Sequence, residues 1–209
     1  MSELGKRYRA NYDRIALESM AISQETRTIA SLVGYDIRRL HYDMPTGDRL
    51  HVVDIGCGKG WVTKDLPFAT VFYTDISVKQ LKSVSGKTIF VADAEVLPMK
   101  DSTADVVVCS DVLEHVLVPK KMASEITRIL RHNGMLLLAV PWEQDLSAYD
   151  DPRYEKRYEF VHLRSIGDPD IFTWFPNYRI QSWTDITNQC PGQWSKYKIK
   201  YMHLENLKK

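Results

Sequence analysis

Five short apolar runs alternate with more polar, helix-like segments between residues 50 and 141 of this 209-residue chain. The runs are LHVVDI, TVFYTDI, TIFVADA, ADVVVCSD and MLLLAVP. Apolar runs of this length, bounded by polar segments, are typical of strands that are buried on both faces. Strands that are separated by helices pair in parallel, because each connection crosses back over the sheet. The pattern therefore predicts an α/β fold whose parallel sheet has helices on both faces.

The chain is expected to form a single domain, residues 1–209, with four parts. Residues 1–45 have a helical pattern and are predicted to form an N-terminal helical cap. Residues 50–141 form the core, and its clearest helix is predicted over 119–134, ended by Gly134. Residues 142–165 are charged and irregular, with aromatic side chains expected to offer a recognition surface, and residues 166–209 hold a short helix and strands. The aromatic side chains are Trp142, Tyr149, Tyr154 and Tyr158. In the last of these strands, Lys196, Lys198 and Lys200 alternate with Tyr197, Ile199 and Tyr201, which predicts one solvated face.

Bulk composition excludes few functions but is informative about partners. Hydrophobic residues make up 44% of the chain and charged residues 26%, as in ordinary globular proteins. The formal net charge of +1 gives no overall attraction to nucleic acid or to an anionic membrane. No apolar run approaches the roughly 20 residues that span a bilayer, and the three cysteines form no CxxC pair. We therefore expect a soluble cytoplasmic protein with reduced thiols and neither a membrane nor a nucleic acid as partner.

A glycine loop, HVVDIGCGKGW, follows the first predicted strand and is expected to precede a helix. It is not a phosphate-binding P-loop, because no GK[ST] follows, and Trp61 stands where a dinucleotide fingerprint needs its third glycine. Asp54 would repel a pyrophosphate but would attract a cation such as an amine or a sulfonium. Asp54 could instead cap the loop's own amides. The loop thus favours a cationic ligand over a dinucleotide.

Acidic residues also end the next three predicted strands. They are Asp75, Asp93 and Asp111. Open α/β sheets bind ligands in the crevice outside the carboxyl ends of their strands, where a carboxylate can accept both hydroxyls of a ribose. With Asp54, these residues indicate a ligand that carries an amine, a ribose and an adenine but no phosphate.

Residues 52–141 resemble the class I S-adenosylmethionine-dependent methyltransferases of the broad small-molecule type. The motifs that carry the resemblance are VVDIGCGKG, TDIS, ADAEVLP, SDVLEHV and LRHNGMLLLAVP, together with ANYDRIA near Tyr12. The resemblance implies a Rossmann-like, seven-stranded, mostly parallel sheet flanked by helices, with a C-terminal antiparallel strand pair. It also implies an enzyme that transfers a methyl group from S-adenosylmethionine to an O or N atom of a small molecule by in-line displacement, leaving S-adenosylhomocysteine.

By this resemblance, Asp54 lies near the donor's amine and Asp75 holds the ribose. Asp93 bonds the adenine amine, the Ala94 amide bonds a ring nitrogen and Ile76 packs on the adenine face. The full donor-binding set is Tyr12, Asp54, Gly56, Cys57, Gly58, Asp75, Ile76, Asp93, Ala94 and Asp111. A methyltransferase for RNA or protein, metal-assisted or not, is the alternative to a small-molecule enzyme; a dehydrogenase and a non-catalytic binding domain are further alternatives.

Glu114 and His115 follow the fourth predicted strand, and His162 ends the irregular segment. A neutral imidazole suits proton removal from an attacking hydroxyl or amine, so His162 is the expected catalytic residue. Some relatives hold a divalent metal with an ExxEH motif and a distant histidine, but Asp111 stands where that motif has its first Glu. The third alternative is structural: His115 caps a helix and His162 packs against the edge of the sheet. The sequence therefore favours His162 acting without a metal.

Overall fold

The computed structural model describes residues 3–15, 22–44, 47–84, 88–147, 162–187 and 198–208. Among the residues that the sequence analysis considered, Tyr149, Tyr154, Tyr158, Lys196, Tyr197 and one of the three cysteines, Cys190, lie outside the described residues. Within the described residues, no helix is long and apolar enough to cross a membrane.

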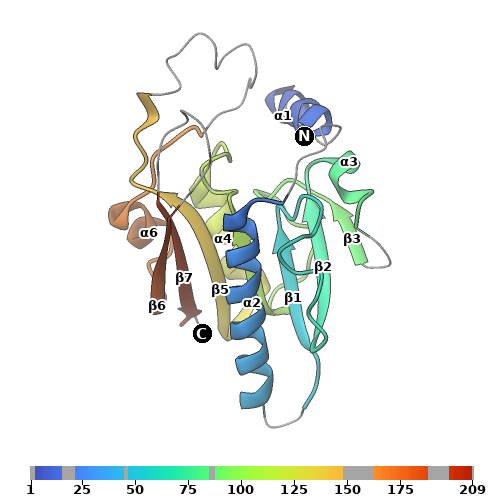
Figure 1. The fold of residues 1–209 in the computed structure, drawn as a ribbon, viewed down its shortest axis with the longest axis vertical. Helices are drawn as coiled ribbons and strands as arrows, with labels where there is room; N and C mark the ends of the chain where they lie inside the picture. The colour runs from blue at the N-terminus through green and yellow to red at the C-terminus, as the bar shows by residue number, and fades with distance from the viewer. Residues whose placement is uncertain are drawn as a thin grey trace.

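Seven strands form one sheet in the order β3-β2-β1-β4-β5-β7-β6 (Figure 1). The strands β1 to β5 are parallel, whereas β7 is antiparallel to both of its neighbours. This confirms the predicted fold class: a mostly parallel, Rossmann-like sheet with a C-terminal antiparallel pair. The bounds are β1 (Leu50–Ile55), β2 (Ala69–Asp75), β3 (Thr88–Val91), β4 (Ala104–Ser110), β5 (Leu130–Trp142), β6 (Tyr178–Thr187) and β7 (Lys198–Asn206).

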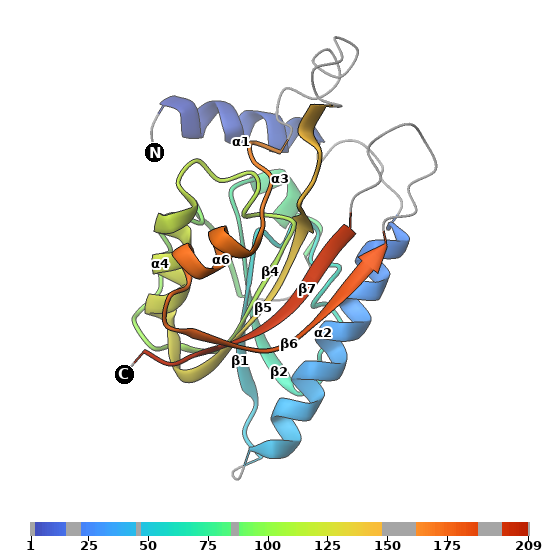
Figure 2. The same cartoon turned by 90° about the vertical axis from the view of Figure 1, so that its left-hand side faces the viewer.

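Helices cover both faces of the sheet (Figure 2). Helix α2 (Gln24–Asp43) lies on one face, and α4 (Pro119–Ile129) and α6 (Asp168–Trp174) lie on the other. Helix α1 (Glu3–Ile15) crosses the end of the sheet near the short α3 (Val78–Leu81). The predicted N-terminal cap therefore divides into two parts, because only α1 lies over the strand ends while α2 packs on the sheet itself.

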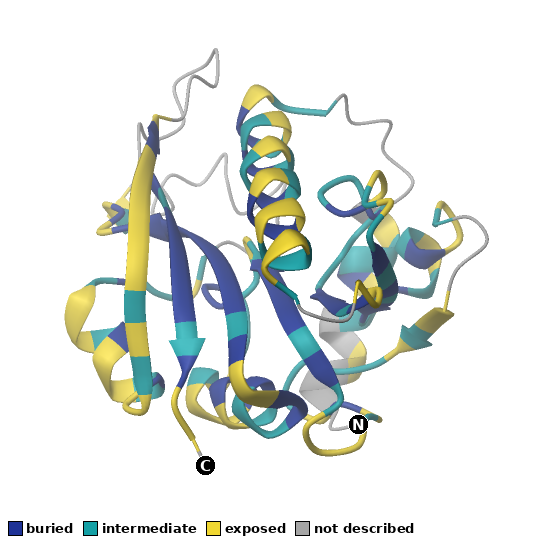
Figure 3. Cartoon of the chain, turned by 90° about the horizontal axis from the view of Figure 1, so that it is seen from below, coloured by how far each residue is buried: buried dark blue, intermediate teal, exposed yellow. Residues whose placement is uncertain are grey.

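The core consists of two apolar layers separated by the sheet, which is buried along its centre (Figure 3). In α2, Ile29, Val33 and Ile37 recur every fourth residue, so they share one helix face and are almost completely buried. Opposite them, Met122, Ile126 and other apolar residues of α4 pack against the second face of the sheet. These two layers fix the strands, and thereby the side chains at the strand ends.

The predicted helix after the glycine loop is not formed; residues 61–65 make turns instead. Only six residues separate Gly60 from Pro67, which is too short a segment to stabilise a helix. The predicted helix over 119–134 also ends early, at Ile129, because Leu130 already has extended dihedral angles and starts β5. A turn at Asn133 (φ 58°) precedes the buried part of that strand.

Two predictions for the C-terminal region need correction. Trp142 is the last residue of β5 and is buried, so it offers no recognition surface. The solvated face of β7 is confined to its beginning, where Lys198 is exposed and Ile199 is buried. Farther along β7, residues on both faces are buried, because the strand lies inside the sheet between β5 and β6.

Candidate active site

A cavity opens at the carboxyl ends of β1, β2 and β4, where the strand order changes direction. The space between its walls, with the open solvent at its mouth included, is about 720 Å³. Four carboxylates line it, which makes it suited to a cation. The lining residues are Tyr12, Ile55, Gly56, Thr74, Asp75, Ile76, Ala92, Asp93, Ala94, Glu95, Asp111, Val112, His115, Val116 and Leu117.

Asp75 links the glycine loop to the end of β2. Its Oδ2 atom accepts a hydrogen bond from the Gly58 amide and its Oδ1 atom accepts one from the Ser77 amide, both at 2.8 Å. Burial raises the pKa of Asp75, while these bonds from the backbone lower it. A carboxylate has about four acceptor positions, so each oxygen can still accept a bond from a ligand hydroxyl.

Asp54 is buried beneath the glycine loop and does not line the cavity. Its Oδ2 atom accepts a hydrogen bond from the Thr63 hydroxyl at 2.6 Å, so it does not cap the amides of its own loop. Burial, together with the nearby Asp75 carboxylate, raises the pKa of Asp54 to about 7. Its charge in the folded protein is therefore set by whether a cation lies nearby.

The glycine loop brings backbone close to the cavity at Gly56. This residue has φ +65°, and a Cβ atom added to it would lie 2.4 Å from Cγ2 of Val112. The position therefore requires glycine both for its backbone conformation and for its closeness to the loop after β4. Gly58 and Cys57 do not line the cavity, and burial raises the pKa of the Cys57 thiol, which stays neutral.

The other strand ends are held by short polar contacts. The Asp93 carboxylate accepts a hydrogen bond from the Glu95 amide at 3.0 Å, and Ser110 and Asp111 share one at 2.9 Å. Asp111 has φ 54°, an unusual value for a residue with a side chain. Such conformations often occur at functional sites, where the surrounding structure holds them.

Helix α1 is attached over the cavity through Asp13. Its carboxylate accepts hydrogen bonds from the Ser77 hydroxyl at 2.5 Å and from the Lys79 amide at 3.1 Å. Tyr12, the residue directly before Asp13, lines the cavity, and its ring meets that of His115 edge-on, with 6.1 Å between centroids. The sequence singled out Tyr12 but gave no sign of the Asp13 contact.

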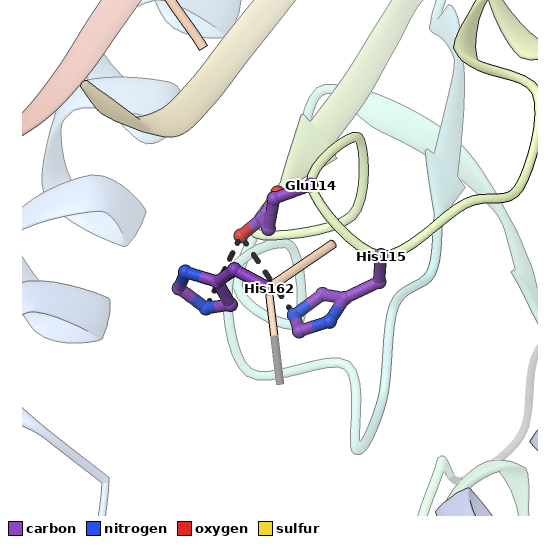
Figure 4. A group of neighbouring side chains, drawn as sticks. All are labelled: Glu114, His115 and His162. Carbon is purple, nitrogen blue, oxygen red and sulfur yellow. Dashed lines mark ion pairs between the residues drawn. The ribbon is translucent and has the colours of Figure 1, made fainter. Parts of the chain in front are cut away.

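Glu114, His115 and His162 come together beside the cavity (Figure 4). Oε1 of Glu114 lies 3.8 Å from Nε2 of His115 and 3.9 Å from Nε2 of His162. Burial and the nearby Asp111 carboxylate hold the pKa of Glu114 well above its usual range. Burial lowers the pKa of His162 to about 4, so its imidazole is neutral at pH 7.

Backbone contacts fix His162 next to Glu114. The Leu163 amide donates to the Glu114 carbonyl oxygen at 2.9 Å. The Arg164 guanidinium donates to the carbonyl oxygens of Leu113, at 2.9 Å, and of Val116. The segment that begins at His162 is therefore tied to the loop after β4, about fifty residues earlier in the chain.

Seven of the ten predicted donor residues line the cavity: Tyr12, Gly56, Asp75, Ile76, Asp93, Ala94 and Asp111. The other three, Asp54, Cys57 and Gly58, do not line it. His162 lies beside it, behind His115, and their rings are 4.8 Å apart between centroids. Glu95 and Thr74 also line the cavity, but the sequence analysis did not single them out. Their closeness in the chain to Asp93 and Asp75 could have indicated them.

Residues 53–138 match the methyltransferase-domain family. This match is consistent with a class I methyltransferase domain. Methyltransferases of this family use S-adenosylmethionine as the methyl donor, which is consistent with the acidic cavity at the strand ends.

Solved structures share the fold of this methyltransferase domain at low sequence identity. The magnesium protoporphyrin IX methyltransferase of Synechocystis, solved with SAH bound, has a TM-score of 0.71 and 17% identity, covering 97% of this chain and 99% of that one. A methyltransferase in complex with the Haloferax volcanii Trm112 methyltransferase activator has a TM-score of 0.65 and 15% identity, covering 96% of this chain and 97% of that one.

Curated relatives match the methyltransferase domain over only part of their length. An uncharacterized protein of Methanocaldococcus jannaschii is 44% identical over 93 residues, which is 43% of this chain and 40% of the relative. The human protein named mitochondrial arginine-hydroxylase NDUFAF5 is 34% identical over 115 residues, 52% of this chain and 33% of that protein. The chain thus spans between a third and a half of the length of these relatives.

Proposed function

We propose that this protein is an enzyme that transfers the methyl group of S-adenosylmethionine to an O or N atom of a small-molecule acceptor. The observation that carries the proposal is the cavity lined by Asp75, Asp93, Glu95 and Asp111 at the carboxyl ends of the parallel strands. These carboxylates attract the donor's sulfonium and amine groups. The product, S-adenosylhomocysteine, has lost the sulfonium charge and is held less strongly, which favours its release.

In this proposal the donor lies across the strand ends. Asp75 accepts the ribose hydroxyls with the acceptor positions that Gly58 and Ser77 leave open. Asp93 and the Ala94 amide bond the adenine, and Ile76 packs against its face. Asp54 acts on the donor's amine through its charge from beneath the glycine loop, and Tyr12 covers the site.

The acceptor enters next to His115 and His162, beside the reactive end of the donor. The Nε2 lone pair of His162 activates the acceptor's attacking atom, and methyl transfer is then an in-line displacement at carbon. Most of the acceleration comes from holding the two reactants in line, with the proton transfer contributing about 100- to 10,000-fold.

The first test measures donor binding by calorimetry. S-adenosylhomocysteine is expected to bind to the purified protein, whereas NAD is not. Binding of NAD without binding of S-adenosylhomocysteine would refute the methyltransferase proposal in favour of a dehydrogenase.

The second test follows the methyl group. Donor labelled in its methyl group is incubated with a panel of small hydroxyl and amine compounds, with RNA and with protein, and the products are resolved by mass. Label in small molecules supports the full proposal, whereas label confined to RNA or protein contradicts its acceptor class. Mass also separates a gained methyl group from a gained oxygen atom, which matters because the human relative is named a hydroxylase.

The third test concerns His162. In a His162→Ala variant, donor affinity is expected to be unchanged and turnover to fall about 100-fold or more. Full turnover would exclude His162 from catalysis.

A further inference from the structure

The carboxylate of Glu114 is completely buried, and neither of its oxygens has a hydrogen-bond partner among the described residues. Buried carboxylates are nearly always satisfied by donors or by a cation, because leaving them unpaired costs several kcal/mol. The side chains that face this carboxylate are two imidazoles, with no Lys or Arg head group in ion-pair contact among the described residues. The carboxylate of Glu114 and the imidazoles of His115 and His162 could therefore serve as three ligands of one cation.

The imidazole of His162 is held in the form that binds a metal. The side-chain carbonyl oxygen of Gln144 accepts a hydrogen bond from Nδ1 of His162. Nδ1 therefore carries the proton, which leaves a lone pair on Nε2, 3.9 Å from Oε1 of Glu114. A buried residue that orients a histidine through its other nitrogen is a recurring feature of metal sites. Gln144 is itself buried, which keeps this orientation fixed.

The distances between the three side chains also suit a metal. Each offers one ligand atom, and these atoms all lie within 4.8 Å of one another. In a tetrahedral site with bonds of about 2.1 Å, neighbouring ligand atoms are about 3.4 Å apart. The carboxylate–imidazole separations of 3.8 and 3.9 Å exceed this by a few tenths of an ångström. The widest separation in the group, up to 4.8 Å, exceeds it by more, so binding would draw the three side chains together. Arg164 and Leu163 already hold the two segments that carry them in contact.

We infer that Glu114, His115 and His162 bind one divalent first-row transition metal ion, which holds the hydroxyl of the acceptor beside the donor. Two imidazoles and one carboxylate favour such an ion over Mg²⁺ or Ca²⁺, which prefer oxygen ligands alone. Three protein ligands leave coordination positions open, as in catalytic sites. His115 also lines the cavity, so an open position faces the donor.

This inference rests on the proposed function and narrows its acceptor to molecules with a hydroxyl that can coordinate a metal. Coordination lowers the pKa of the hydroxyl, whose proton passes to solvent water. The oxygen then forms a bond to the methyl carbon, the carbon–sulfur bond breaks, and its electron pair stays on sulfur. In this arrangement the lone pair of His162 binds the ion, so activation of the hydroxyl by the metal replaces the direct proton transfer to His162 in the proposed function.

The test is a calorimetric titration of Zn²⁺ into protein that has been treated with a chelator. One ion is expected to bind per chain, and the affinity is expected to fall about 100-fold or more in Glu114→Gln and in His162→Ala. A Gln144→Ala variant removes the orienting contact and is expected to lose about 10- to 100-fold. The matched control is His132→Gln, an exposed histidine at the opposite end of β5, which should bind as the original protein does.

Binding of S-adenosylhomocysteine is measured in parallel on every variant. If it is retained while Zn²⁺ binding is lost, the variants are folded and the metal site is supported. The absence of saturable Zn²⁺ binding in the original protein, or equal affinity in His162→Ala and the original, would overturn the metal site while leaving the proposed methyl transfer intact. Failure to bind S-adenosylhomocysteine would instead refute the proposed function, whatever the metal titration shows.

Discussion

The donor half of the sheet, β1 to β4, and its C-terminal half, β5 to β7, use buried polar groups differently. In the donor half, Asp75 and Asp93 stand at strand ends, face a cavity and hold loop amides. In the C-terminal half, the Tyr201 hydroxyl donates to Asp36 of α2 at 2.6 Å, inside the layer between helix and sheet. Polar groups at strand ends are available for ligands, whereas those between layers stabilise packing.

The comparison explains why the sequence reveals the donor side of the proposed reaction more readily than the acceptor side. Donor chemistry requires carboxylates at fixed places in a regular βα alternation, so it leaves a motif. The acceptor side depends on a tertiary contact between the loop after β4 and the segment at His162, which no local spacing records.

Removing Asp75 should have the largest effect on the donor half. Asp75→Ala removes the acceptor of the Gly58 and Ser77 amides and the proposed acceptor of the ribose hydroxyls. Charge-assisted hydrogen bonds contribute about 1.5–3 kcal/mol each, so the affinity for the donor should fall by about 100-fold or more. Calorimetric titration with S-adenosylhomocysteine measures this affinity, and a variant of an exposed aspartate, Asp65→Ala, is the control. Unchanged affinity would remove Asp75 from the donor site.

Gly56→Ala should have the next largest effect. The added Cβ would lie 2.4 Å from Val112, at a backbone angle that side chains rarely adopt, and donor affinity should fall by roughly 10- to 100-fold. A second substitution, Val112→Ala, removes the clash but not the backbone strain. The double variant should therefore regain part of the affinity lost by Gly56→Ala, and no recovery would show that strain alone limits this position.

Tyr201→Phe tests the C-terminal half. It removes a buried hydrogen bond to Asp36, and the free energy of unfolding should fall by about 2 kcal/mol. Donor affinity should not change, because neither residue lines the cavity. Denaturant unfolding and calorimetry together give both numbers. A loss of donor affinity with normal stability would mean that the two halves are not separable in the way that the comparison proposes.

The pH dependence of donor binding should give the smallest effect. The pKa of Asp54 is about 7 in the donor-free protein, so below pH 7 this group is increasingly protonated. A cationic donor favours the ionised form, so affinity should be steady above pH 7 and fall toward tenfold per pH unit below it. Asp54→Asn should bind more weakly above pH 7 and lose this dependence. A flat profile in the original protein would give Asp54 a purely structural role.

Much of the fold followed from the sequence, because buried strands and strand-end acids are local patterns. The five parallel strands and the crevice between β1 and β4 were predicted in this way. The errors arose where tertiary packing decides the outcome. Trp142 was expected at the surface but is covered by Lys200, whose Nζ lies 3.7 Å from the ring centroid. The helix expected after Gly60 fails because Pro67 follows too soon.

At the candidate site, the sequence identified Glu114, His115 and His162 but not how they are arranged. Whether His162 acts alone or with a metal depends on the hydrogen bond from its Nδ1 to Gln144 and on the burial of Glu114. Both are tertiary features, as are the contacts by which Arg164 holds two distant segments together. No periodicity in the chain records such a contact.

The position of β7 between β5 and β6 affects how the sheet can fold while the chain is being synthesised. β7 follows both strands in the chain but pairs with each of them. While the chain emerges from the ribosome, β5 therefore keeps an unpaired edge, with its apolar side chains incompletely covered, until β7 has been synthesised. Over that interval the edge of β5 is open to pairing with other chains, so chaperones that shield strand edges should matter most until β7 has been made.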